Sequence, residues 1–460
     1  MSELLFETDW LASQPVFYNS ATGRASRNIH EVIDYANIRF SPEGFNNYLD
    51  FGYSVLEQTP IENVKFLRHS SRLWRDEQGR LSVEYLDDPV ATWMDYRLSE
   101  SDVIDLTREK VRKWERSVEG EIVVPTSSGY DSRLLNWCLQ DKARIRSFTY
   151  GVSENQAESN EAVLAQRLSE TLGFRWERIQ LDEFHRYLDD WDELFGVSTH
   201  AHGMYHFEFY EKILPRIDGG NPLLSGIIGD GWAGNVSIPA LENSDDVRRL
   251  GYTHGLRGDS DQSLLRSEQS LLSNYWHAQK DLLKDDRFRV VEAMRFKLML
   301  LCYLRIVPEH FGYRWWSPFL DIDVAMAMLN LPAERRRERL WQTEFFRAEG
   351  LDLESMNLEA TTENTLDMQG LRAIPVRPLD VTLLREVVRP DYVKMINREL
   401  LKGPLTRPER SLNLLLGVRK VSWVLRRLGF SARTRRHSEF YSPYMVLLPI
   451  EQALRRRNEK

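Results

Sequence analysis

Cysteine is nearly absent from this chain of 460 residues: only Cys138 and Cys302 occur, with no CxxC pair and no cysteine–histidine cluster. A disulfide framework and a structural zinc site are therefore not expected, and a reducing compartment is favoured. No apolar run approaches the roughly 18–20 residues of a membrane-spanning helix. The acidic first residues also lack the basic and apolar parts of a secretory signal, so we expect a cytoplasmic protein.

An overall excess of positive charge is missing as well, because the formal net charge is −8. Residues 401–460 hold 14 Lys and Arg against 4 Asp and Glu, a local charge of +10, so the first 400 residues carry −18. Domains that bind nucleic acid in general are basic. We therefore expect no nucleic-acid partner for the main body of the chain.

The chain divides by pattern into four parts. Short apolar alternations, as in 80–85, predict antiparallel strands early in the chain, and the charged periodic stretch 98–117 predicts a helix. From about residue 121 strands alternate with helices, and helical periodicity dominates the later part. The predicted parts are a small antiparallel β domain (1–95), a linker helix (96–120), the main α/β domain (121–400) and a basic tail (401–460).

The main domain is predicted to be α/β, with a parallel Rossmann-like sheet, flanking helices and a helical C-terminal part. The expected strands are 122–124, 146–150, 176–181 and 222–224, and the expected helices are 132–140, 158–172 and 204–214. Strand–helix alternation of this kind gives a parallel sheet. Since ligands bind at the carboxyl ends of such strands, the loops after 124 and 224 are the first candidates for chemistry.

The loop after the first of these strands reads Thr-Ser-Ser-Gly-Tyr-Asp-Ser over residues 126–132. Small side chains let backbone N–H groups approach an anion closely, and the next helix adds partial positive charge at its N-terminus. A simple helix-capping turn would use similar residues, but the position after a buried strand favours a phosphate site. Its candidate residues are Thr126, Ser127, Ser128, Gly129, Asp131 and Ser132.

A second glycine-rich loop, Ser-Gly-Ile-Ile-Gly-Asp-Gly over residues 225–231, follows the strand 222–224. It carries Asp230 as the first loop carries Asp131. Mg²⁺ bound to a nucleotide usually takes one or two protein carboxylates plus phosphate oxygens. Because both aspartates follow strands of one parallel sheet, they predict a shared Mg²⁺ site.

These loops resemble those of a known family. The first loop resembles the pyrophosphate-binding loop S-G-G-x-D-S, with Ser128 in place of the first Gly. The second resembles S-G-x-G-x-D-E, with Gly231 in place of Glu. A third stretch, Ser-Pro-Phe-Leu-Asp over 317–321, resembles R-x-P-F-L-D, although Arg314 lies four residues before Pro318 instead of two. In this order the stretches are similar to those of asparagine and β-lactam synthetases.

The resemblance implies an ATP- and Mg²⁺-dependent ligase. Such an enzyme adenylates a carboxylate, releases pyrophosphate and then transfers ammonia or an amine to the acyl-adenylate. The resemblance implies that Thr149, Tyr150 and Gly151 contact adenosine and that Gly229 faces the phosphates. It implies metal ligation by Asp131 and Asp230. The implied catalytic residues are Asp131, Asp230 and Arg314.

Two features of the family are missing. The family's glutaminase nucleophile is the Cys exposed when Met1 is removed, whereas Ser2 stands here and residues 1–95 are too few for that domain. We predict a truncated relic without glutamine hydrolysis, so that ammonia or an amine comes from elsewhere, such as a separate glutaminase. A late Lys is also missing, because none lies between Pro332 and Lys394. The arginines considered in its place are Arg335, Arg336, Arg337, Arg347, Arg372 and Arg377.

Polar residues before the predicted helix 204–214 are candidates for contacts to the substrate. His200, His202 and His206 are spaced like metal ligands, but no Cys or carboxylate completes the set, so a polar pocket wall is favoured. The acidic run 182–193 is interpreted as a solvated helix face. The substrate candidates are His200, His202, Tyr205, Ser225 and Gly226.

The basic tail predicts an amphipathic helix, with apolar residues at Leu414, Val418, Val421, Leu425 and Leu428. Packing of its apolar stripe on the protein body is favoured. The alternative is peripheral contact with an anionic membrane on its inner face.

The carboxylate and the amine stay open. A small-molecule or glycan-linked carboxylate, such as a uronic acid of a cell-surface glycan, is the leading hypothesis. The alternatives are asparagine synthesis from free ammonia, an RNA-modifying pyrophosphatase and a non-catalytic partner protein. The missing Glu and Lys count against the first, and the acidic body disfavours the second.

Overall fold

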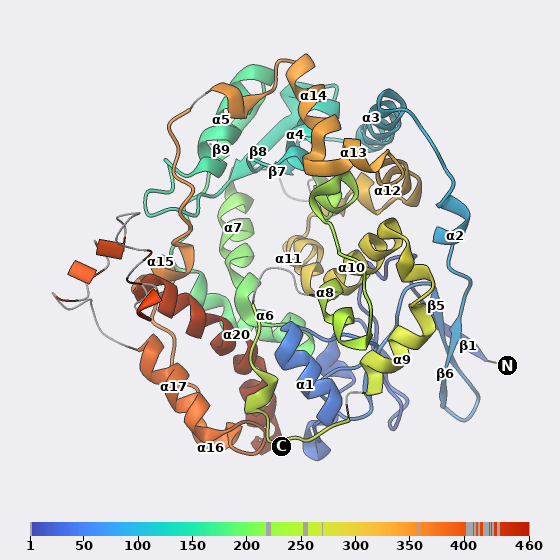
Figure 1. Ribbon diagram of the computed structural model, residues 1–460, viewed down its shortest axis with the longest axis vertical. Coiled ribbons are helices and arrows are strands. Elements are labelled where there is room, and N and C mark those ends of the chain that lie inside the picture. Colours follow the sequence, from blue (N-terminus) through green and yellow to red (C-terminus); the bar gives the residue numbers. More distant parts are fainter. Residues whose placement is uncertain are drawn as a thin grey trace.

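The computed structural model describes most of the chain (Figure 1). The ranges outside the described residues are 1, 218–221, 252–255, 269, 357, 402–407, 409–410, 413–414, 417–422, 424, 426, 430–432 and 460.

A five-stranded parallel sheet forms the centre of the main domain, in the order β11-β10-β7-β8-β9. Its strands are β7 (Ile122–Pro125), β8 (Ile145–Thr149), β9 (Arg175–Arg178), β10 (Pro222–Leu224) and β11 (Arg314–Trp316). Four of them confirm the expected strands and the α/β class. The fifth, β11, was not among the expected strands.

Helices cover this sheet close to where the periodicity predicts them. They are α3 (Glu100–Ser117), α4 (Tyr130–Cys138), α5 (Asn160–Leu172) and α7 (Tyr205–Ile213). α3 begins at a capping box, in which the Ser99 hydroxyl and the Asp102 side chain each bond to the other residue's backbone N–H. α5 ends at Gly173, whose φ of 75° is the left-handed conformation that glycine adopts readily.

The N-terminal region forms two antiparallel sheets of three strands (lower part of Figure 1). One contains β1 (Glu3–Glu7), β5 (Ser71–Arg75) and β6 (Leu81–Tyr85), and the other contains β3 (Ala25–Ser26), β2 (Phe17–Asn19) and β4 (Val64–Phe66). The helix α1 (Pro42–Phe51) lies between β3 and β4 in sequence. Trp10 Nε1 donates to the carbonyl of Leu320 at 2.8 Å, so this region packs directly on the main domain.

The later part of the chain is helical, as expected. The longer helices are α9 (Ser270–Gln279), α10 (Asp286–Leu301), α11 (Tyr303–His310), α12 (Ile322–Leu329), α14 (Leu340–Ala348), α17 (Pro390–Leu400) and α20 (Arg433–Asn458). Shorter ones are α2 (Val90–Trp93), α6 (Leu188–Phe195), α8 (Arg248–Gly251), α13 (Ala333–Arg336), α15 (Leu366–Ala373) and α16 (Val381–Leu384). Within the described ranges, no helix combines the length and the apolar character that crossing a bilayer requires.

The end of the basic tail is part of the core. In α20, Tyr441 and the residues 444–448 are buried, and Tyr48 donates to the carbonyl of Val446 at 3.1 Å. The predicted tail 401–460 is therefore not separate from the body of the protein over its whole length. Of the predicted amphipathic stripe, Leu414, Val418 and Val421 lie outside the described residues, whereas Leu428 is 67% exposed.

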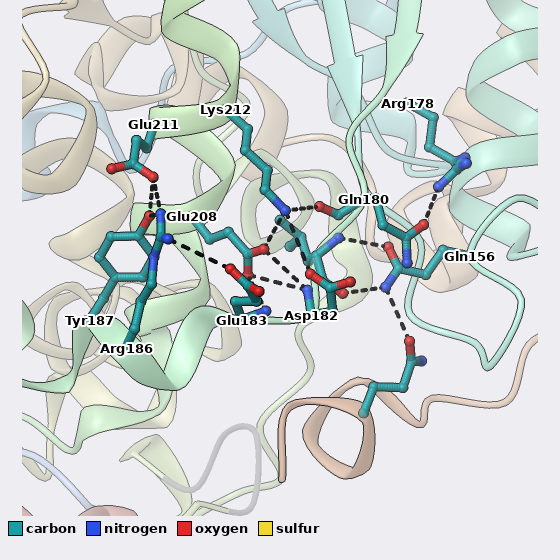
Figure 2. A network of polar contacts seen from close by, with 12 residues as sticks. Gln156, Arg178, Gln180, Asp182, Glu183, Arg186, Tyr187, Glu208, Glu211 and Lys212 are labelled. Atoms are coloured by element: carbon teal, nitrogen blue, oxygen red, sulfur yellow. Dashed lines mark hydrogen bonds and ion pairs between the residues drawn. The ribbon is translucent and has the colours of Figure 1, made fainter. Parts of the chain in front are cut away.

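A paired polar network joins the segment after β9 to α7 (Figure 2). The Glu208 carboxylate is fully buried and accepts from Asp182 N–H, Glu183 N–H and Lys212 Nζ, the last at 2.5 Å. Further along the acidic run, Asp192 is only 3% exposed and pairs with Arg456 at 2.7 Å. The run 182–193 is thus not a uniformly solvated face, because part of it anchors α7 and α20.

Candidate active site at the carboxyl edge of the sheet

The two predicted aspartate loops meet where the strand order of the sheet reverses. From β7 the chain continues outward through β8 and β9, and then returns to add β10 on the other side of β7, where Leu223 pairs with Val123. A crevice at such a switch point is the usual ligand site of an open α/β sheet. The loops after β7 and β10 leave the two strands that flank this point.

The first loop is held in shape by its own hydroxyl groups. Ser132 Oγ accepts from Ser127 N–H at 3.1 Å and lies 3.2 Å from the carbonyl oxygens of Ser127 and Gly129. Gly129 N–H donates to Ser127 Oγ at 3.1 Å. Ser127 and Ser132 therefore fix the loop itself, in addition to any contact that they make to a ligand.

Amide groups of this loop remain available to an anion. α4 begins at Tyr130, and the N–H groups of its first turn have no carbonyl partner inside the helix. Within the described part of the chain, the N–H groups of Ser128, Tyr130, Asp131 and Ser132 donate to no other residue. This cluster, at the positive end of a nine-residue helix, can hold phosphate oxygens.

The two predicted carboxylates are brought together at this edge. Asp230 N–H donates to Asp131 Oδ2 at 2.7 Å, and Asp230 Oδ2 accepts from Asn235 at 2.9 Å. The other oxygen, Asp131 Oδ1, is buried and has no hydrogen-bond partner among the described residues. Burial, followed by the charge of Asp230, raises the pKa of Asp131 well above its usual value.

Glycine is required where the second loop wraps around Asp131. A Cβ at Gly229 would lie 2.8 Å from Asp131 Cγ and 2.8 Å from the ring of Phe319, and one at Gly226 would lie 3.2 Å from Asp131 Cβ. Ser225, at the end of β10, donates its N–H to Trp316 and accepts from Ile227 N–H. The substrate candidates Ser225 and Gly226 thus shape the loop around the first aspartate.

The third predicted stretch completes the group. Phe319 packs on Gly229, and its carbonyl accepts from Trp232 Nε1 at 2.9 Å. Of the three segments that carry the family resemblance, 225–231 therefore contacts both of the others, through Asp131 of 126–132 and Phe319 of 317–321.

The carboxylate pair fits a divalent cation. Mg²⁺ in nucleotide sites needs one or two protein carboxylates, because phosphates and water supply its other oxygen ligands. The orphaned oxygen Asp131 Oδ1 offers one ligand, and Asp230 lies beside it. In the described ranges, no group of three or more His, Cys, Asp or Glu side chains is arranged to hold a metal ion.

The predicted adenosine residues have mainly structural contacts. Thr126 Oγ1 accepts from Asn136 and Ser147, and Thr149 Oγ1 donates to the carbonyl of Thr126 at 2.6 Å. A Cβ at Gly151 would lie 2.2 Å from the carbonyl oxygen of Gln156, so this glycine permits a close chain approach. Tyr150 follows β8 and packs against the aromatic face of α7, 5.6 Å from Tyr205 between ring centroids.

Arg314 lies away from this group. It begins β11 opposite Pro222, the first residue of β10, and the first residues of parallel strands lie at the amino edge of the sheet. Arg314 therefore lies at the opposite edge of the sheet from the loops that carry Asp131 and Asp230, and its catalytic role stays a prediction.

Most arginines considered for the missing late Lys are occupied by other partners. Arg335 pairs with Glu100, Arg336 with Asp286, Arg347 with Asp352, Arg372 with Glu154 and Arg377 with Glu451. Arg337 is exposed.

Arg339, which the sequence analysis missed, does face the site. Its guanidinium lies 4.5 Å from the ring centroid of Tyr130, and its charge acts on Asp131. It lines a cavity of about 460 Å³ together with Ser128 and Gly129. In the described part of the chain its guanidinium has no hydrogen bond or ion pair, so it is available to a phosphate. Only its position two residues beyond the Arg335–Arg337 run could have suggested it.

Lys297 is the second cation that the sequence analysis missed. It lies on α10, is 8% exposed, and has a pKa lowered by burial and raised in part by Asp230. On the same helix, Met294 fills the space at Gly231, since a Cβ there would lie 2.5 Å from its sulfur. Where the resembled family has a Glu side chain, this chain has Gly231, and Met294 occupies the adjoining space. A single Lys within the apolar run 290–301 was the available signal.

Backbone strain marks the same place. Ile228, Glu338 and Arg339 have φ of 53°, 53° and 56°, the left-handed region that non-glycine residues rarely adopt. All three belong to the segments that surround the carboxylate pair. Such strain persists where the surroundings impose it, often at ligand sites.

The predicted histidines gather beside Tyr150. His202 Nε2 lies 3.0 Å from Asp367 Oδ1, with side chains 21% and 31% exposed. His200 Nδ1 accepts from His202 N–H at 3.2 Å, and the Tyr205 ring lies 5.6 Å from the rings of Tyr150 and His202 between centroids. These side chains form a polar and aromatic wall near the end of β8.

Comparisons with known proteins add little. No family model and no curated protein match the chain. An NH3-dependent NAD synthetase from Campylobacter jejuni subsp. jejuni NCTC 11168 matches at 16% identity and TM-score 0.22, over 47% of this chain and 96% of that one. A glutamine-dependent NAD+ synthetase from Acinetobacter baumannii matches at 12% and 0.20, over 67% and 53%. Scores this low carry no argument, so the fold rests on the sheet described above.

Proposed function

We propose that this chain is an ATP-dependent carbon–nitrogen ligase that adenylates a carboxylate, releases pyrophosphate and transfers ammonia or an amine to the acyl-adenylate. The observation that carries the proposal is the contact of Asp230 N–H with Asp131 Oδ2 at 2.7 Å, beside the free amides of α4. Two carboxylates and an anion site at one switch point are what a metal-bound nucleoside triphosphate needs.

The adenylation step assigns roles to each part of the site. An oxygen of the substrate carboxylate attacks the α-phosphorus, and the bond to the β-phosphate oxygen breaks, so that pyrophosphate leaves with the electron pair. The amides of Ser128, Tyr130, Asp131 and Ser132 and the guanidinium of Arg339 are positioned to hold the leaving pyrophosphate. Mg²⁺ on Asp131 and Asp230 would neutralise charge on the phosphates.

The proposal extends to the substrate as a small-molecule or glycan-linked carboxylate, such as a uronic acid. The partly exposed His202–Asp367 pair, near Tyr150 at the carboxyl edge of the sheet, supports a polar acceptor pocket. Ammonia or the amine would come from solution or from a separate glutaminase. Peripheral contact with a membrane is supported only by the exposed Trp423 and Leu428 of the basic segment.

The test is exchange of labelled pyrophosphate into ATP, with Mg²⁺ and a panel of carboxylates that includes aspartate, free uronic acids and nucleotide-linked uronates. Exchange that depends on one carboxylate and disappears in Asp131→Asn would establish adenylation and identify the substrate class. Asp190→Asn is the matched control, because Asp190 is an exposed residue of α6. Aspartate as the sole active member would favour asparagine synthesis. ATP binding without exchange for any carboxylate would favour a non-catalytic partner protein.

A further inference from the structure

A cavity of about 310 Å³ is formed by the N-terminal region together with the helices α9 and α10. Small-molecule sites are typically cavities of roughly 300–1,000 Å³ with apolar walls and a few polar groups. This cavity fits that description, because most of its lining is apolar. The apolar lining residues include Leu11, Pro15, Val55, Leu56, Phe66, Leu67, Leu271, Phe296 and Met299.

The cavity is separate from the proposed nucleotide site. None of the described residues that line it belongs to 126–132, 225–231 or 317–321. Phe296 and Met299 of α10 line the cavity, whereas Met294 of the same helix contacts Gly231. At 3.6 residues per turn these side chains leave α10 in different directions. The helix therefore has the cavity on one side and the Asp230 loop on another.

Some polar side chains of the cavity wall already have partners. Glu292 accepts from the Tyr275 hydroxyl and pairs with Arg295 at 2.7 Å. Glu57 accepts from the Tyr85 hydroxyl at 2.8 Å. These groups hold the wall together without a ligand.

Three other polar side chains of the wall have atoms without a partner. The Arg68 guanidinium lies 4.1 Å from the ring centroid of Tyr85, but it has no hydrogen bond or ion pair with a described residue. Arg68 Nε, His69 Nδ1 and Ser54 Oγ are all buried and unbonded among the described residues. All three residues line the cavity, and Ser54 is only 1% exposed. Because an unsatisfied buried polar group lowers stability, their presence together indicates a ligand.

The chemistry of these groups selects a carboxylate. Burial, with the charge of Arg295, lowers the pKa of His69 to about 4, so its ring is neutral at pH 7. A neutral imidazole and a hydroxyl can each donate one hydrogen bond, and a guanidinium can only donate. One acceptor group can therefore serve Arg68, His69 and Ser54, and the charge of Arg68 favours an anionic acceptor. Burial also raises the pKa of the nearby Glu57, which reduces the charge that would oppose an anion.

We propose that this cavity binds a small apolar carboxylate, whose carboxylate group contacts Arg68, His69 and Ser54 and whose apolar part lies against α9 and α10. An apolar cavity of about 150 Å³ holds benzene. A cavity of about 310 Å³ therefore accommodates about 10–15 non-hydrogen atoms. The proposal does not depend on the ligase reaction, and the bound molecule is not the carboxylate that would be adenylated.

The test is calorimetric binding to the full-length chain near neutral pH, with octanoate, 4-phenylbutyrate, octanamide and octylamine as probes. Arg68→Met removes the cation. Ala278→Trp fills the cavity from α9, where Ala278 lines it and is itself exposed. Arg24→Met is the matched control, because Arg24 is an exposed residue of the N-terminal region outside the lining. Thermal unfolding is measured on every variant.

We expect wild type to bind octanoate or 4-phenylbutyrate with a Kd of about 10–100 µM, and octanamide about tenfold more weakly. Octylamine should not bind. Arg68→Met should weaken binding of the carboxylates about 10–30-fold and change that of octanamide less than about twofold, which also shows that its cavity is intact. Ala278→Trp should abolish binding of both kinds of probe, and Arg24→Met should match wild type.

The proposal would be overturned if wild type bound none of the probes at about 1 mM, a concentration at which even weak sites fill. Binding of octylamine or octanamide as tight as that of octanoate would contradict recognition of a carboxylate. Carboxylate affinities that stay unchanged in both Arg68→Met and Ala278→Trp would place the binding outside this cavity.

Discussion

Charged side chains occur together in two regions of this molecule, and the regions differ in whether the buried ones have hydrogen-bond partners. In the network between β9 and α7, the buried Glu208 carboxylate accepts from two backbone N–H groups and from Lys212 (Figure 2). At the carboxyl edge of the sheet, Asp131 Oδ1 is buried and has no hydrogen-bond partner among the described residues.

In the first region the buried charges stabilise the fold, whereas in the second a buried charge has no protein partner and can bind a ligand. A buried charge with all its hydrogen bonds satisfied contributes to a unique structure, and removing one partner is costly. An unsatisfied charge does not help the fold, so its removal should affect chemistry more than stability. The two regions therefore predict opposite mutational behaviour.

Asp131→Asn should have the largest effect. The amide oxygen can still accept from Asp230 N–H, but the charge that would bind Mg²⁺ is lost. We expect pyrophosphate exchange to fall at least about 10³-fold, equivalent to about 4 kcal/mol, with thermal stability equal to or above that of wild type. Exchange kinetics and calorimetry on the same preparations measure both. A variant that unfolds readily would show that Asp131 belongs with the structural charges.

Glu208→Ala should behave in the reverse way. It removes the acceptor of the Asp182 and Glu183 N–H groups and one partner of Lys212, which keeps its hydrogen bond to the carbonyl of Gln180. Because Lys212 is 32% exposed and can be solvated, we expect a loss of about 2–3 kcal/mol in the free energy of unfolding, less than for a fully buried pair. Urea denaturation measures it, with Glu211→Ala as a more exposed comparison. Unchanged stability together with lost ATP binding would contradict the distinction between the two regions.

Arg339→Ala should weaken binding of ATP and pyrophosphate about 10–30-fold, or about 1.4–2 kcal/mol, because one charge-assisted contact to phosphate is removed. Stability should not change, since the guanidinium pairs with no described carboxylate. The neighbouring Arg337→Ala is the matched control, as Arg337 is exposed. Equal weakening in both variants would indicate a general effect of charge and no specific contact.

His206→Phe should have the smallest effect, and only at acidic pH. Burial, with the nearby His202, lowers the pKa of His206 to about 3, whereas the unfolded chain protonates it near 6.5. Between these values the unfolded state binds the extra proton, so wild-type stability falls as pH falls below 6.5, by at most about 1.4 kcal/mol per pH unit. The variant should show a shallower decrease between pH 6.5 and 4 in chemical denaturation. Parallel curves would refute this account.

The sequence predicts well where the information is local. Strand, loop and helix follow one another within residues 122–138, and Asp131 and Asp230 could be paired because parallel strands end at one edge. The helices α3, α5 and α7 likewise carry their own caps or periodicity.

Local patterns fail where long-range packing decides. β11 has three residues and is a strand only because β10 lies beside it, so no local pattern indicates that Arg314 begins a strand at the amino edge of the sheet. α10 is buried on almost every side, and nothing in its own sequence tells which face Lys297 occupies. The final helix reads as a basic tail, yet its middle turns are core because α1 and α17 contact them.

The hydrogen bond between Asp230 and Asp131 joins residues 99 positions apart in the chain. During synthesis, the first phosphate loop is complete long before its second carboxylate exists, and at roughly 5–20 residues per second the ribosome needs about 5–20 s to add the missing segment. A nascent chain halted before β10 would expose a half-site unable to hold metal and nucleotide together. Under the proposed function, nucleotide would therefore bind only after the second loop has been synthesised and β10 has paired with β7.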